Sequence, residues 1–199
     1  MKAFQKTFAF TVILFFYFSR FAFAHVNPDD YNSFPSGFFH PLSGLDHILV
    51  MVAVGLWAVQ LSGDAIWKIP IAFIFAMTIG FVLALNGVFL PFVEPVILAS
   101  VSIIGLLIVV FLRLPTAIAV FVVAILAVFH GHAHGNEFNS ISAFGYGFGF
   151  IAATTLLHGT GVIIAFGSDF LLGKLNRYCV TRISGFLTTL IGLYLIFTA

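Results

Sequence analysis

The stretch HPLSGLDH, residues 40–47, places two histidines and an aspartate at the start of a long apolar segment. On one helix His40 and His47 share a face, because seven residues make almost two turns, and His47 lies roughly 10 Å deeper than His40. Asp46 points about 100° away from His47 around the helix axis, so it either joins a shared site or orients an imidazole through a hydrogen bond. This spacing predicts a metal site; the alternative is that Asp46 only joins helices through a hydrogen bond.

A second group of histidines lies in FHGHAHGNE, residues 129–137. His130 and His134 are one helical turn apart, so they can bind one ion together if the helix continues. His132 and Glu137 provide further ligands if one of the glycines bends the chain. Three imidazoles and a carboxylate so close together are typical of a metal site, and a chance histidine-rich loop is the alternative.

Two further histidines, His158 and His25, extend these groups. His158, in ATTLLHGTGV, lies deep in another apolar segment, where a packed and hydrogen-bonded ring is the alternative to metal binding. Arranged by expected depth, the candidate ligands are His25, His132, His134 and Glu137, then His40 and His130, then Asp46 and His47, and finally His158. Several partial sites of this kind suit a permeation path, because an ion must be able to leave each site as well as enter it.

The ligand types narrow the choice of metal. Imidazoles with a few carboxylates suit Ni²⁺, Co²⁺, Zn²⁺ or Cu²⁺. The chain has one cysteine and three methionines, which argues against Cu⁺, and it offers too few oxygen ligands for Ca²⁺ or Mg²⁺. We therefore expect a divalent transition metal as the bound or transported ion, and no prosthetic group.

The elements that position these side chains are apolar helices in a lipid bilayer. The chain has 199 residues, 61% hydrophobic and 8% charged, and its mean hydropathy is +1.16. A soluble domain could not present such a surface to water, so the sequence predicts an integral membrane protein. The near-neutral charge argues against nucleic-acid binding. The single Cys179 excludes a disulfide framework within one chain, and the sequence has no phosphate-binding Gly-Lys-Ser/Thr loop.

The first apolar run has the features of a secretory signal peptide. Two lysines form a basic start, a short apolar core follows, and Ala-Phe-Ala at residues 22–24 is a small-residue cleavage pattern. We expect cleavage that separates a signal peptide, residues 1–24, from a membrane domain, residues 25–199. His25 would then be the N-terminal residue. A retained first helix is the alternative.

Six hydrophobic runs follow, each near the roughly 20 residues that cross a bilayer. Their uniform apolarity indicates helices, since membrane strands alternate between apolar and polar residues. Small residues, most clearly Gly145 and Gly149, predict close helix packing. The expected fold is all-α, a polytopic bundle of six transmembrane helices over residues 40–61, 68–90, 95–112, 115–134, 141–166 and 179–198.

The distribution of charges gives an orientation for these spans. Because basic loops stay cytoplasmic, we expect a multi-pass protein of the bacterial inner membrane with both mature termini on the periplasmic side. An exported N-terminus agrees with a signal peptide. With six spans, one side carries the basic residues of the membrane domain and the other side four acidic residues, namely Lys68, Arg113, Lys174, Arg177 and Arg182 against Asp29, Asp30, Glu94 and Glu137.

At these motifs the chain resembles the HupE/UreJ family of nickel and cobalt permeases. That family shows a His-x5-Asp-His element in its first mature helix, which matches His40, Asp46 and His47. Its Phe-His-Gly-x-Ala-x-Gly-x-Glu element in the fourth helix matches FHGHAHGNE, and its Ala-Thr-x-x-Leu-His pattern in the fifth helix is similar to ATTLLH. The resemblance covers essentially the whole chain.

The resemblance implies secondary uptake of Ni²⁺ or a close relative, supplying metalloenzymes such as hydrogenase or urease. Nickel and cobalt members share these motifs, so the metal stays open. His132 and His134 occupy variable positions of the second motif, and their role depends on spacing alone. The residues implied to be functional are His40, Asp46, His47, His130 and Glu137.

Two other functions stay open beside a transporter, which we expect not to be an enzyme. An intramembrane zinc hydrolase could use the same ligands to activate water. The spread of the ligands along depth argues against it, and three ligands converging on one ion would favour it. A metal-sensing or accessory subunit would bind the ion without moving it. The sequence sets neither the oligomeric state nor the driving force.

Overall fold

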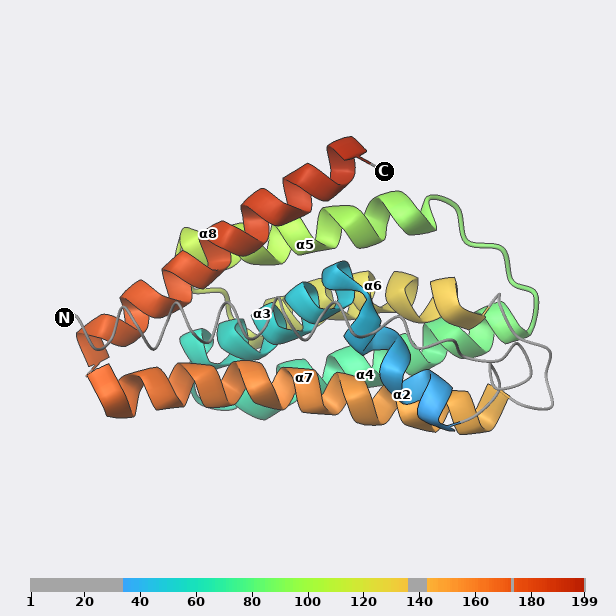
Figure 1. Ribbon diagram of the computed structural model, residues 1–199, viewed down its shortest axis with the longest axis horizontal. Coiled ribbons are helices and arrows are strands. Elements are labelled where there is room, and N and C mark those ends of the chain that lie inside the picture. Colours follow the sequence, from blue (N-terminus) through green and yellow to red (C-terminus); the bar gives the residue numbers. More distant parts are fainter. Residues whose placement is uncertain (1–33, 136–142, 173, 199) are drawn as a thin grey trace.

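The computed structural model describes residues 34–135, 143–172 and 174–198. Over these ranges the chain forms α-helices and no strand, which confirms the all-helical prediction. The seven helices of the described ranges, with the labels of Figure 1, are α2 (Phe34–Ser43), α3 (Leu45–Leu61), α4 (Ala65–Leu85), α5 (Val93–Val109), α6 (Thr116–Gly135), α7 (Ala143–Leu172) and α8 (Lys174–Thr198).

Within these described ranges four helices, α4, α6, α7 and α8, are long and apolar enough to cross a membrane. The bent pair of α2 and α3 counts as a fifth span if it is taken as one unit. Helix α5 is apolar but has 17 residues, at the lower limit for a span. The chain is therefore a polytopic helical membrane protein. The predicted signal peptide, residues 1–24, lies outside the described residues, as does His25.

The predicted first span, residues 40–61, is not one helix. The chain bends by 84° between α2 and α3. The bend falls at Gly44, whose backbone is extended (φ −90°, ψ 121°) and interrupts the helical hydrogen bonding. A Cβ atom at this position would lie 2.8 Å from a carboxylate oxygen of Asp46 and 2.9 Å from Nδ1 of His47. The absence of a side chain at Gly44 therefore leaves space beside the bend for the side chains of Asp46 and His47.

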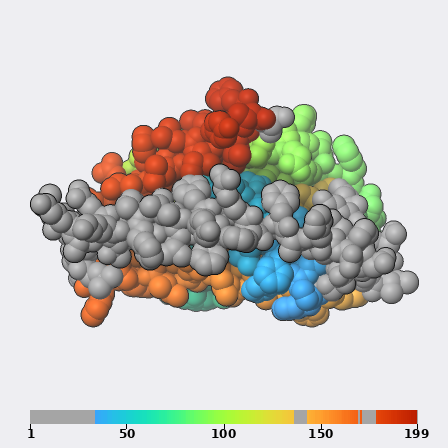
Figure 2. Space-filling model, viewed as in Figure 1, coloured from blue at the N-terminus to red at the C-terminus, as the bar shows by residue number. Residues whose placement is uncertain are grey.

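The helices pack as pairs with close backbone contact (Figure 1). Helix α4 packs along α6, α5 along α8, and both α2 and α3 pack on α7. Figure 2 shows α5 and α8 together on one side of the surface. Each pair brings one glycine from each helix so close that a Cβ would come within 3.0 Å of the partner helix: Gly37 and Gly149, Gly55 and Gly161, Gly80 and Gly131, Gly105 and Gly185. The predicted role of small residues in packing is confirmed at Gly149.

The basic residues of the described ranges gather at one end of the bundle. Figure 1 shows that α4, α6 and α8 begin and α5 and α7 end there. Lys68 lies in the first turn of α4, Arg113 between α5 and α6, and the other three in the first half of α8. Acidic residues are not confined to the opposite end, because Asp64 and Asp169 also lie here. Lys68 Nζ donates to Asp64 Oδ2 at 2.7 Å, which lowers the pKa of Asp64.

Candidate metal centre

Three imidazoles from three helices converge inside the bundle. His40 comes from the last turns of α2, His47 from the first turn of α3, and His134 from the end of α6. One ring nitrogen of each lies within 4.8 Å of the others, which is close enough for one ion to bind all three. His47 and His134 are buried, and His40 is half-buried. We call these three residues the histidine cluster.

The cluster overturns the expected order of ligands by depth. On a straight helix His40 would lie about two turns from His47. The 84° bend at Gly44 instead brings the two rings to a centroid distance of 5.8 Å. His134 lies against both, with centroids 4.4 Å from His40 and 4.9 Å from His47. These three candidates therefore form one site rather than successive levels.

A chain of polar contacts runs from Asp46 through His47 to His134. Asp46 Oδ2 lies 3.0 Å from His47 Nδ1, which favours a hydrogen on Nδ1 and leaves the lone pair of a neutral ring on Nε2. His47 Nε2 lies 2.7 Å from His134 Nε2, and two nitrogens this close share one hydrogen. His134 then donates to His47. Asp46 is therefore close enough to orient the His47 ring through its charge, although the geometry at His47 Nδ1 is not that of a hydrogen bond, and the orienting role stays a prediction.

Aromatic side chains of α7 form one wall of the cluster. The Phe150 ring lies 4.8 Å from that of His134, and the Tyr146 ring lies 6.0 Å from that of His40. Tyr146 stacks between Phe150 and Phe81 of α4, at 6.1 and 6.2 Å. Both α7 residues are almost fully buried. In the sequence only the glycines of this stretch predict a role, although the i, i+4 spacing of the two aromatic residues also indicates a shared face.

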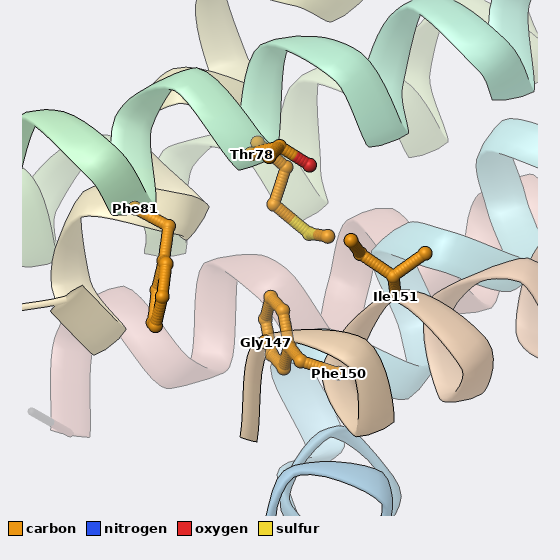
Figure 3. Close-up of a pocket in the computed structure, with 6 residues that line it drawn as sticks. Thr78, Phe81, Gly147, Phe150 and Ile151 are labelled. Carbon is orange, nitrogen blue, oxygen red and sulfur yellow. The ribbon is translucent and has the colours of Figure 1, made fainter. Parts of the chain in front are cut away.

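The packing beside this wall is tight and apolar. A cavity of about 30 Å³ lies between α4 and α7, with Phe81 and Phe150 facing into it from opposite helices (Figure 3). That volume is about the share of one water molecule. The hydroxyl group of Thr78 in its lining donates to the carbonyl of Ile74 at 2.8 Å. This cavity therefore does not offer a polar route for an ion.

His130 lies beside the cluster rather than in it. Its ring is fully buried and meets the His47 ring edge-on at a centroid distance of 5.5 Å. Its Nε2 lies 2.9 Å from Oγ of Ser100, a buried residue of α5 that belongs to none of the predicted motifs. Phe73 of α4 also packs against His130, at a ring-centroid distance of 5.8 Å. No local spacing could have indicated Ser100 or Phe73, because both come from other helices.

The structure separates His132 from the cluster. Helix α6 continues unbroken through Gly131 to Gly135, so a residue two positions from His130 and from His134 faces the opposite way. His132 Nε2 donates to the carbonyl of Val88 at 2.7 Å. The bend on which a ligand role for His132 depended is absent, and Gly131 makes close contact with α4. Glu137 lies outside the described residues.

His158 is a separate buried imidazole between α4 and α7. Its Nδ1 donates to the carbonyl of Thr154 at 2.7 Å, which leaves the lone pair on Nε2. Nε2 is buried and has no hydrogen-bond partner among the described residues. The ring packs on Phe73 at a centroid distance of 4.9 Å. It also lines a cavity of about 280 Å³ whose other lining residues, among them Trp67 and Ile71, are apolar apart from Thr155. Metal binding by His158 stays a prediction.

A helical membrane protein with buried imidazoles converging between its spans is the class that these observations define. The family model described as HupE / UreJ protein matches residues 13–195, and the chain belongs to this family. Protein HupE of Rhizobium leguminosarum bv. viciae is 46% identical over 158 residues, which cover 79% of this chain and 81% of that protein. No solved structure matches the chain. The resemblance seen in the sequence is thereby confirmed.

Proposed function

We propose that this protein is a secondary permease that carries a divalent transition-metal ion, Ni²⁺ or Co²⁺, inward across the bacterial inner membrane. In this proposal the ion supplies metalloenzymes such as hydrogenase or urease, and Zn²⁺ is a competing ion. The observation that carries the proposal is membership of the HupE/UreJ family. The convergence of His40, His47 and His134 within 4.8 Å supports it by supplying a site for the ion.

The chemistry of the cluster suits a site that an ion enters and leaves. Three imidazole nitrogens favour Ni²⁺, Co²⁺ or Zn²⁺ over Mg²⁺ and Ca²⁺, which prefer oxygen. Three ligands leave coordination positions open, so the ion is held less firmly than in a closed tetrahedral site. Intramembrane ionisable residues mark ion pathways by default. Glu137 and His25 are proposed to contribute at the periplasmic entrance.

The orientation proposed for the bundle follows the basic residues. Lys68 and Arg113 lie at the end where α4 and α6 begin, and we assign this end to the cytoplasm. The cluster includes His134, which lies at the other end of α6, so it would face the periplasmic half. With α5 counted as a span, and α2 and α3 as one, six spans place both mature termini outside.

Metal accumulation in vesicles tests the proposal directly. The purified full chain is reconstituted into liposomes, and radioactive Ni²⁺ is followed into the lumen with and without excess Co²⁺ or Zn²⁺. We expect accumulation above that of protein-free liposomes, and inhibition by Co²⁺. Metal bound by the protein but excluded from the lumen would contradict a permease.

An intramembrane metal-dependent hydrolase is the second candidate, because one observation favours it. Catalytic zinc sites also use three protein ligands and an open position, and the cluster supplies three imidazoles at one level. Binding without accumulation, together with cleavage of a lipid or peptide substrate, would support this function. Binding with neither accumulation nor cleavage would support a sensing or accessory role.

Replacing Asp46 by asparagine is expected to weaken metal binding about 10- to 100-fold, as is typical when a partner of a ligating histidine is lost. The amide has a similar size but no charge, so the preference for a hydrogen on His47 Nδ1 is weakened. Equilibrium binding of Ni²⁺ to the purified variant measures the change. Asp64→Asn is the matched control, since Asp64 contacts Lys68 at the surface. Equal affinity of the two variants would contradict an orienting role for Asp46.

Replacing His158 by alanine distinguishes a transport role from packing. If Nε2 of His158 receives the ion after the cluster, the rate of uptake falls severalfold while the affinity of the cluster is unchanged. Initial rates in vesicles and equilibrium binding measure the two quantities. Thr160→Val on the same helix is the control, because the Thr160 hydroxyl donates only to the carbonyl of Leu156. An unchanged rate in His158→Ala would leave His158 a packed residue.

A further inference from the structure

In the described residues, one polar contact joins α5 to a candidate ligand. It is the contact between Ser100 and His130. The Ser100 side chain is fully buried. Its Oγ lies 2.6 Å from the carbonyl oxygen of Ile97 and 2.9 Å from Nε2 of His130. Neither of the two histidine motifs includes this helix, so the contact arises from the packing of α5 beside α6.

The positions of hydrogens in this contact follow from the chemistry of the three groups. A carbonyl oxygen can only accept, and two oxygens 2.6 Å apart repel unless a hydrogen lies between them. The single hydrogen of the Ser100 hydroxyl is therefore directed to the Ile97 carbonyl. Ser100 Oγ then accepts from His130, so Nε2 of His130 carries the hydrogen. In a neutral imidazole the lone pair is then on Nδ1.

The remaining nitrogen of His130 is free to bind an ion. His130 Nδ1 is buried and has no hydrogen-bond partner among the described residues. The ring lies next to His47 of the cluster, at a centroid distance of 5.5 Å. A metal ion requires a lone pair, whereas a ring of the other tautomer would present an N–H group at Nδ1 and could not bind the ion there.

We propose that Ser100 is a positioning residue that fixes His130 in the tautomer with its lone pair on Nδ1. His130 is thereby ready to take an ion from the histidine cluster without first exchanging a hydrogen between its nitrogens. The consequence for uptake rests on the proposed permease function, whereas the tautomer itself does not. Partners of this kind determine which nitrogen of a histidine is available in metal sites.

Nitrogen-15 NMR of histidine-labelled protein in lipid nanodiscs tests the tautomer without any metal. We expect His130, assigned by the loss of its signals in His130→Gln, to show a protonated Nε2 and an unprotonated Nδ1 in the wild-type chain. A wild-type His130 with its hydrogen on Nδ1 would overturn the proposal. This measurement needs no variant of Ser100.

Two variants of Ser100 and one control then test the consequence. Ser100→Ala removes the acceptor, so we expect His130 to populate the second tautomer and the uptake rate of Ni²⁺ to fall about 10-fold or more, as for other partners of ligating histidines. Ser100→Thr keeps a hydroxyl that can bond the same carbonyl, so we expect the His130 tautomer and the uptake rate to stay close to wild type. Ser102→Ala is the matched control, because its hydroxyl is directed to Thr189 of α8.

The results separate this proposal from the proposed function. A lower rate in Ser100→Ala with an unchanged His130 spectrum would overturn the positioning role, since a merely structural defect would have that signature. A changed spectrum in Ser100→Ala, with a normal one in Ser102→Ala, supports it even if wild-type vesicles accumulate no metal. A lack of metal accumulation in wild-type vesicles would contradict only the proposed permease function, not the positioning role of Ser100.

Discussion

His47→Ala is expected to abolish metal uptake in vesicles. His47 is the central member of the cluster, because its ring contacts those of His40, His130 and His134. Loss of an outer partner of a metal ligand costs about 10- to 100-fold in affinity or activity, and loss of a ligand itself should exceed that. We expect uptake more than about 100-fold below wild type, measured as initial rates of Ni²⁺ accumulation at equal protein content.

The controls for this prediction are chosen to separate ligation from packing. His47→Gln keeps a polar side chain of similar volume and is expected to fail equally, since an amide is a poor substitute for an imidazole ligand. His132→Ala removes a buried histidine of α6 that bonds the Val88 carbonyl, and it should be milder. Insertion into the membrane is checked for each variant by its yield and elution profile. Uptake in His47→Ala above one tenth of wild type would remove the central ligand from the proposed path.

Binding of an ion also requires a small movement inside the cluster. Two nitrogens at about 2.1 Å from one metal ion are about 3.0 Å apart when they meet at a right angle, and further apart in a tetrahedron. The His47 and His134 Nε2 atoms are 2.7 Å apart. The ion would therefore displace the shared hydrogen, which moves from Nε2 to Nδ1 of His134, and would separate the rings slightly. The half-buried His40, on the short helix α2, would complete the proposed set of ligands.

The sequence was sufficient for features that depend on local periodicity. The apolar runs predicted membrane helices, and the spacing of His130 and His134 predicted a shared face on α6. Both rings do lie on that face, but they make different contacts. His134 belongs to the histidine cluster, whereas His130 forms a hydrogen bond with Ser100. The motif match alone would have given His130 the larger role, because His134 occupies a variable position.

The remainder of the site depends on tertiary packing that no periodicity reveals. The spacing of His40 and His47 predicts their positions on one straight helix, whereas the helix bends at Gly44 between them. Because of this bend, His40 and His47 lie together in the histidine cluster rather than at separate depths. The contacts of Ser100, Phe73 and Phe150 likewise come from helices far apart in the sequence, and only the packing of α4, α5 and α7 around α6 and α3 brings them together.

Gly131→Ala is expected to disrupt the bundle and with it the cluster. A Cβ atom at Gly131 would overlap the backbone carbonyl oxygen of Met77 on α4, and a backbone atom cannot move aside as a flexible side chain can. Forcing extra volume into a packed interior costs about 1–3 kcal/mol, whereas the gain in helix propensity from glycine to alanine is about 1 kcal/mol at most. The overlap should therefore dominate. We expect a lower thermal unfolding temperature in detergent and little uptake.

Gly159→Ala on α7 is the matched control for this substitution. A Cβ atom at Gly159 would meet nothing within 4 Å, so the same added methyl group should leave the unfolding temperature and uptake close to wild type. Gly131 lies between His130 and the rest of the second motif, so separating α4 from α6 there would also displace the His130 and His134 rings. A Gly131→Ala protein as stable and active as Gly159→Ala would mean that α4 and α6 do not make backbone contact at this point, and the packing that holds His134 against His47 would then need another cause.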